Sequence, residues 1–161
     1  VVAVGQKYGY YAGVGIISAT GDSFSVAGGA LSITEDDLNP AASDAVPNTD
    51  NVVFLIAELD AQDEPITITQ ITVDVDLTAT SGVQVADTYL QDMSLYLDGV
   101  LVAGPEDVLI NNANYTDSVV FEDEFTVTGK QSLKVVMDIT DDASDGDYSV
   151  SIDDSGIIAE D

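Results

Sequence analysis

The stretch that decides the fold is PITITQITVDVDL, residues 65–77, in which apolar residues recur at every second position. This is the period of a β-strand with one buried face. The apolar positions are Ile66, Ile68, Ile71, Val73, Val75 and Leu77. The spacing slips by one between Ile68 and Ile71, so Thr69 and Gln70 together occupy a place where a regular strand accepts one residue. A β-bulge there would return the apolar residues to one face, and the sequence therefore predicts a long, bent central strand.

The other face of this strand is polar and carries Thr67, Thr72, Asp74 and Asp76. Acidic residues dominate the whole chain of 161 residues, because 30 of them stand against three lysines, with no arginine or histidine, and the formal charge is −27. A field of this sign repels phosphate backbones and anionic lipid headgroups, so we expect neither nucleic acid nor an anionic membrane surface as a partner. The charges also repel one another, which predicts a need for salt or bound Ca²⁺.

The composition predicts one domain preceded by an arm. Hydrophobic residues make up 45% of the sequence, enough for one core, and no composition break divides residues 18–161, which we therefore predict to be a single domain. No run of eighteen apolar residues is present and cysteine is absent, so the sequence predicts neither a membrane-spanning helix nor a disulfide framework. The sequence opens at Val1 without a methionine or a basic leader, which favours a secreted, extracellular or cell-surface protein whose signal segment has been removed.

The arm, residues 1–17, reads VVAVGQKYGYYAGVGII and carries a single charge, on Lys7. Its four glycines disfavour a helix by about 1 kcal/mol each, whereas an extended segment beside a neighbouring strand tolerates them. Two interpretations stay open. The arm is either a first strand within its own sheet or a donor strand that completes the sheet of the next subunit. In the second case the subunit interface would involve Val1, Val2, Val4, Tyr8, Tyr10 and Tyr11.

The remaining sequence predicts an all-β fold. Short runs of alternating or continuous apolar residues indicate about eight to ten strands, without a convincing amphipathic helix. We expect residues 52–59 to form a strand buried on both sides, 60–64 a turn, and 119–127 one strand with Phe121 and Phe125 facing inward. Asp98 and Gly99 between apolar runs predict a type I′ hairpin. The predicted architecture is an antiparallel β-sandwich, immunoglobulin-like or jelly-roll-like, around Phe54, Ile71, Val73, Leu95, Phe121, Phe125, Val135 and Val150.

A family resemblance rests on the succession of strand patterns. The segments GGALSI, VVFLIAELDA, EPITITQITVDVD, MSLYLDGVLV, VVFEDEFTV and SLKVVMDITDDASDGDYSVSI, within residues 23–152, resemble the immunoglobulin-like sandwich domains of prokaryotic cell-surface and S-layer-type proteins. The apolar arm followed by FSVAGGALSI is similar to TasA-type donor-strand fibre proteins and archaeal bundling pilin subunits. This resemblance implies subunits that are joined by donated strands. The sequence lacks the long N-terminal helix of type IV pilins.

The residue inventory argues against an enzyme. Without histidine and cysteine, Ser-His-Asp and Cys-His mechanisms and imidazole or thiolate zinc sites are excluded. Paired carboxylates for glycoside hydrolysis are compatible with 30 acidic residues, but the sequence has no tryptophan to stack on a sugar and no arginine to hold a substrate. We therefore expect no catalytic residues and no organic cofactor.

Calcium is the one cofactor that the sequence raises. Asp141, Asp142, Asp145 and Asp147 lie within seven residues around a glycine, and hard oxygen ligands on a turn suit Ca²⁺, although the spacing does not fit an EF-hand. A solvated acidic turn is the alternative. Asn114 begins the only N-glycosylation sequon, Asn-Tyr-Thr, in a predicted exposed turn.

Two function classes follow from these observations. The first is a structural subunit of an extracellular filament or surface lattice, a homopolymer that assembles through the arm at residues 1–17; a virion surface protein would fit the same description. The second is a monomeric adhesion module, whose loops at 35–51 or 141–147 would bind Ca²⁺, surface carbohydrate or a receptor.

Overall fold

A single strand, β4 (Thr49–Ala79), holds the structure together. The computed structural model describes residues 2–4, 11–13, 30–79, 90–109, 116–141, 143 and 146–160, and of residues 2–4 and 11–13 only the backbone. The other elements are β1 (Val2–Val4), β2 (Tyr11–Gly13), β3 (Ala30–Glu35), β5 (Leu90–Leu97), β6 (Val100–Glu106), β7 (Thr116–Phe121), β8 (Phe125–Ile139), β9 (Gly146–Ser151), the 3-10 turn η1 (Asp154–Gly156) and β10 (Ile157–Glu160). The all-β class is confirmed.

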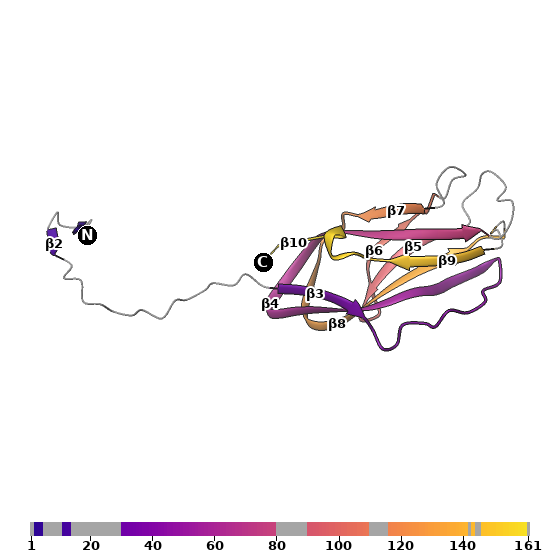
Figure 1. The fold of residues 1–161 in the computed structure, drawn as a ribbon, viewed down its shortest axis with the longest axis horizontal. Helices are drawn as coiled ribbons and strands as arrows, with labels where there is room; N and C mark the ends of the chain where they lie inside the picture. Colours follow the sequence, from indigo (N-terminus) through magenta and orange to yellow (C-terminus); the bar gives the residue numbers. More distant parts are fainter. Residues whose placement is uncertain are drawn as a thin grey trace.

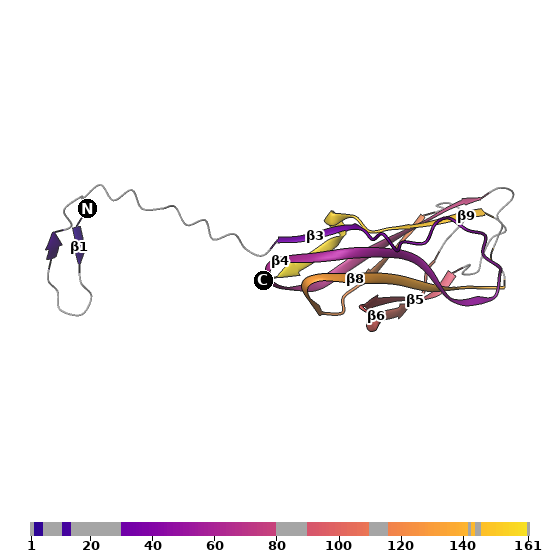
Figure 2. The same ribbon diagram turned by 90° about the horizontal axis from the view of Figure 1, so that it is seen from below.

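The sandwich is made from one continuous antiparallel sheet of eight strands, whose two halves face each other (Figure 1). The first half of β4 lies between β3 and the second part of β8, and β5 and β6 follow outward from β8. The second half of β4 pairs with β7 and the start of β8 on one side and with β9 and β10 on the other. Figure 2 shows the succession β3, β4, β8, β5 and β6 from below. The long central strand therefore belongs to both layers.

The turn predicted at residues 60–64 is wrong, because β4 passes through this region as a strand. Ala61 pairs with Gly129 and Ile66 pairs with Val127, so the four residues between them on β4 lie opposite Thr128 alone. Asp63 and Gly129 both have positive φ, at 71° and 64°. Extra residues on one strand of a pair increase its bend, and here β4 and β8 turn a corner together. The chain changes layers without breaking its strand.

The predicted bulge at Thr69 and Gln70 is confirmed. On β10, Ile158 pairs with Gln70 and the next residue, Ala159, pairs with Ile68, so that Thr69 is the additional residue. The Thr69 hydroxyl donates a hydrogen bond of 3.3 Å to the carbonyl oxygen of Ile158. As a result, every apolar residue of the 65–77 stretch is buried, with at most 3% of its surface exposed.

One hydrophobic core joins the two layers. It includes Ile71, Val73, Leu95, Phe121, Phe125 and Val135 of the predicted core. Phe54 and Val150 are only partly buried against it. Val53 pairs with Val136 and Leu55 with Val135, so Phe54 is the extra residue of a second bulge, and this segment is less enclosed than its continuous apolar sequence predicted.

The strand predicted at 119–127 is two strands. β7 ends at Phe121, β8 begins at Phe125, and Glu122, Asp123 and Glu124 form an exposed connection between them. Both phenylalanines face inward as predicted, with exposed fractions of 1% and 8%. The break lies opposite the bulge of β4, because Phe121 pairs with Ile71 and Phe125 pairs with Ile68.

The Asp98-Gly99 hairpin between β5 and β6 is confirmed, since Leu97 pairs with Val100 and both turn residues have positive φ. The Asp98 carboxylate accepts hydrogen bonds of 2.9 Å from the Ser132 backbone N–H and from the Gln131 side-chain amide. These two bonds, in that order, lower the pKa of the Asp98 carboxyl. The side chain thus extends the pairing of β5 with β8 into the turn.

Replacing Gln131 with leucine should raise the pKa of Asp98, because one of the two hydrogen bonds to the charged form is lost. A lowered folded-state pKa contributes stability above the unfolded value of about 3.9, and this contribution is lost as the pH falls through the folded-state pKa. NMR titration of the Asp98 carboxyl carbon in both chains measures the shift. Thr126→Val is the control, because it changes a residue of the same strand but leaves Gln131 and Ser132 in place. It should not shift the pKa of Asp98.

Candidate functional site

The described strands of the arm pair with each other and not with the domain. Val2 pairs with Gly13 and Val4 with Tyr11 in an antiparallel ladder, which forms a two-stranded sheet separate from the eight-stranded sheet. The arm expected to be extended is therefore, in its described parts, two short strands that fold back on each other. Of the predicted interface residues, Val1, Tyr8 and Tyr10 lie outside the described residues.

A groove of about 670 Å³ lies between the two layers, where β3 of one layer faces β9 of the other. One wall is formed by Ile33, Leu55 and Ala57 from β3 and β4, and the other by Val150 and Ile152 from β9 and the segment after it. Polar residues complete the lining, namely Thr34, Glu35, Asn39, Ser151, Asp153 and Ser155. The interior of the sandwich is thus open to solvent along this side.

The strands beside the groove have unpaired edges. Within the described residues, β3 and β9 each pair with β4 alone. The pairing of β3 with β4 ends at Glu35 and Ala57, although β4 extends back to Thr49. An unpaired edge presents backbone N–H and C=O groups that a further strand can bind. The groove therefore combines an apolar floor with backbone groups suited to an added strand.

A turn closes the end of β3. The Asp36 backbone N–H donates to the Ile56 carbonyl oxygen over 3.1 Å, and the Asn39 side-chain oxygen accepts from the Ile56 N–H over 2.8 Å. Asn39 also donates to the Glu35 carboxylate over 2.9 Å. An amide side chain thus takes the place of the next strand residue, which stops β3 and fixes one end of the groove.

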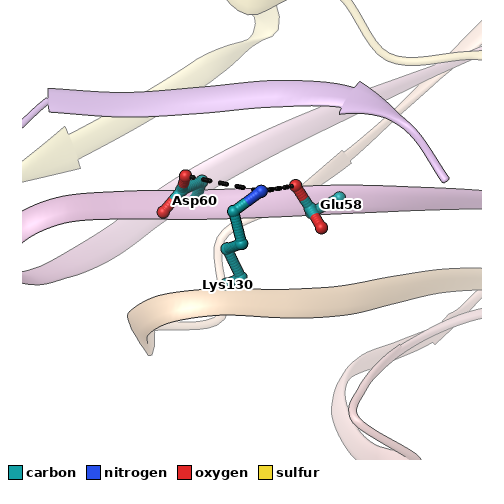
Figure 3. Close-up of polar contacts among 3 residues, drawn as sticks. All are labelled: Glu58, Asp60 and Lys130. Carbon is teal, nitrogen blue, oxygen red and sulfur yellow. Dashed lines mark hydrogen bonds and ion pairs between the residues drawn. The ribbon is translucent and has the colours of Figure 1, made fainter.

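The clearest ion pair among the described residues lies on the outer face of β4 and β8 (Figure 3). The Lys130 ammonium group is 2.5 Å from Glu58 Oε1 and 3.9 Å from Asp60 Oδ2. The hydrogen bond and charge of Glu58 raise the pKa of Lys130, and the charge of Asp60 adds to this effect. Because the ammonium group is solvent-exposed, this ion pair adds little to the stability of the fold.

The predicted calcium ligands are only partly described. Asp141 lies in a turn and Asp147 in β9, both exposed, whereas Asp142 and Asp145 lie outside the described residues, as does the sequon residue Asn114. In the described part of the chain no group of three or more acidic side chains is arranged to hold a metal ion. Calcium binding at the four aspartates therefore stays a prediction.

Calcium is expected to raise the thermal unfolding midpoint by several degrees at millimolar concentration, through oxygen ligands in the 141–147 loop. Differential scanning calorimetry at fixed ionic strength, with NaCl in place of CaCl₂ as the control, measures this shift. An equal rise with sodium would mean that screening of the −27 charge is the whole effect.

Comparison with known proteins adds no relative, since the chain matches no family model, no curated protein and no solved structure. None of the helical segments in the described ranges has the length and apolar character needed to cross a membrane. The fold therefore defines an acidic, antiparallel, sandwich-like all-β protein.

Sequence reasoning missed the groove, because it placed Val150 in the core and considered the 35–51 loop as a surface binding loop without relating it to β9. The signal would have been a contrast in strand length, which the sequence hides because residues 60–64 have the polarity of a turn. β3 has six residues and is followed by a long polar loop, whereas the strand beside it is much longer. A short strand beside a long one must leave part of the long strand's edge uncovered.

Proposed function

We propose that this protein is a structural subunit of an extracellular filament or surface lattice, and that each subunit donates its N-terminal arm, residues 1–17, to the next. The observation that carries the proposal is that the arm's strands pair with each other and not with the eight-stranded sheet, in which β3 and β9 pair with β4 alone as far as the described residues show. Strand addition to a free edge supplies backbone hydrogen bonds for affinity and side-chain contacts for specificity.

The charge distribution supports the same proposal. All 30 acidic residues and two of the three lysines lie in residues 18–161, which therefore carry a formal charge of −28, whereas residues 1–17 carry +1. Two domains of this charge repel each other when their surfaces come within the screening length, which is about 8 Å in physiological salt. In dilute buffer the screening length is greater, and the repulsion acts over a longer distance. The arm is the part of the chain that can approach another copy without this penalty.

Deleting residues 1–17 should abolish polymers and leave a soluble folded domain, because the deletion removes the donated strand but no residue of the eight-stranded sheet. Negative-stain microscopy and size-exclusion chromatography measure assembly, and circular dichroism measures the fold. Val4→Asp, which places an acid in the arm, should also block assembly, and Val4→Ile is the matched control that should retain it. Filaments of the truncated chain, or a full chain that stays monomeric in high salt, would contradict the proposal.

A further inference from the structure

We infer that the groove between β3 and β9 is the acceptor site for the arm of a second copy of this chain. The inference rests on the proposed function and adds the place where the donated strand binds. The groove is where edges of both layers and the open interior meet, as its lining residues from β3, β4 and β9 show.

The groove is better suited to binding an extended strand than to binding a compact ligand. Its apolar residues come from both layers, with Ile33 and Leu55 on one side and Val150 and Ile152 on the other. All of them are half-buried, so apolar surface remains accessible to solvent between β3 and β9, which pair with β4 alone among the described strands. The side chains of an inserted strand would remove this apolar surface from water, and its backbone would pair with a strand edge.

The arm suits this place by size and charge. Residues 1–4 are VVAV, small and apolar at every position, so either face of an inserted strand would present apolar groups to the groove. Glu35 and Asp153 line the groove, and a segment with acidic residues would meet like charges there. The arm has no acidic residue and carries Lys7 three residues beyond Val4. Among segments of this chain, it alone combines these properties.

The pairing of β1 with β2 does not compete strongly with insertion. The ladder consists of three residue pairs, and an isolated two-stranded hairpin is at best marginally stable in water. Releasing β1 from β2 therefore costs little compared with placing the same strand against a sheet that already contains eight strands.

The competing acceptor is the outer edge of β6, which lies at the opposite end of the sheet and pairs only with β5 within the described ranges. The hairpin there exposes Val100 by 66% and Leu101 by 50%, so it also offers apolar side chains beside unpaired backbone groups. It lies at the outer edge of a single layer, whereas the groove offers walls from both layers. We therefore expect the arm to choose the groove.

Cysteine cross-linking tests the choice, because the chain has no cysteine of its own. Val2→Cys and Val4→Cys place a thiol on the arm, and Ser151→Cys or Thr34→Cys places one at the groove. Leu101→Cys on β6 is the matched control. Disulfides form when Cα atoms come within about 4.4–6.8 Å, so mild oxidation of assembled double variants should link neighbouring subunits into a ladder on non-reducing gels only for the groove pairs.

The results distinguish a wrong acceptor site from a wrong proposed function. Groove-specific ladders that do not form when the subunits are diluted to monomers before oxidation support the inference. Filaments that cross-link through Leu101→Cys, or that form normally but cross-link at neither position, overturn the groove as acceptor and leave strand donation itself intact. The absence of any assembly in the parent chain overturns the proposed function, and the acceptor site with it.

Discussion

A chain that lacks Thr72 should not fold, whereas a chain that lacks Thr69 should. Thr69 is the additional residue of the β4 bulge, so its removal returns β4 to a regular alternation with Ile68 and Ile71 on the same face. Thr72 lies within regular pairing to β7, and its removal, with the bulge held in place by β10, would exchange the two faces of every following residue. These two single-residue deletions, three positions apart, should therefore have opposite effects on folding.

The energetic reason is the composition of the two faces. Loss of Thr72 would turn Val73, Val75 and Leu77 outward. Exposing each of these buried side chains would lower the free energy of unfolding by about 1.5–3 kcal/mol. It would also turn Asp74 and Asp76 toward the core, where an unpaired carboxylate costs several kcal/mol. The sum exceeds the stability of about 5–15 kcal/mol that a domain possesses.

Circular dichroism and urea denaturation of both deletion variants measure this difference. The Thr69 deletion should unfold cooperatively at a lower urea midpoint, because the fit to β10 changes, and the Thr72 deletion should show no unfolding transition. A cooperative transition in the Thr72 deletion, or none in the Thr69 deletion, would contradict the assignment of the bulge.

Replacing Gly104 with alanine should destabilise the domain by about 2–5 kcal/mol, from about 1–2 for a left-handed backbone and 1–3 for overpacking. Gly104 has a φ of 92°, and an added Cβ would overlap the Met93 carbonyl oxygen and lie 3.1 Å from Ser94 Cα. Both atoms belong to the backbone of β5, which cannot move without disturbing its pairing with β8.

Gly99 provides the matched control for this substitution. Its φ is 82°, but an added Cβ would have no atom within 4 Å, so Gly99→Ala should cost only the backbone preference of about 1–2 kcal/mol. Free energies of unfolding from urea denaturation give both values. Equal losses at the two positions would show that the packing against β5 contributes nothing.

The central strand, its bulge and the Asp98-Gly99 hairpin could be predicted because each depends on local chemistry. The period of Ile66 to Leu77 specifies the buried face, and the Asp-Gly pair specifies positive φ at two positions. The inward direction of Phe121 and Phe125 was predictable for the same reason, although the break between them was not. Alternation continues formally through Glu122 to Glu124, and only the contacts of the whole sheet end the strand.

The corner and the groove could not be predicted because they depend on distant partners. Asp60 to Glu64 has the polarity of a turn, and only the facing residues Thr128 and Gly129 make it a bend within a strand. The groove arises because Asn39 stops β3 before β4 ends, which is a contact across 17 positions. Whether the arm binds there depends on a second copy, which a single sequence does not contain.

The attachment of β3 and β10 at the corner of β4 has a mechanical consequence. Ala30, the first residue of β3, pairs with Gln62, and Glu160, at the end of β10, pairs with Thr67, so both ends of the domain lie at the same pole (Figure 1). Tension applied to Ala30 along the axis of β3 acts perpendicular to the cross-strand hydrogen bonds of its six residue pairs and loads them together in shear. All six pairs then share the load, whereas a force directed across the strands would open them one after another.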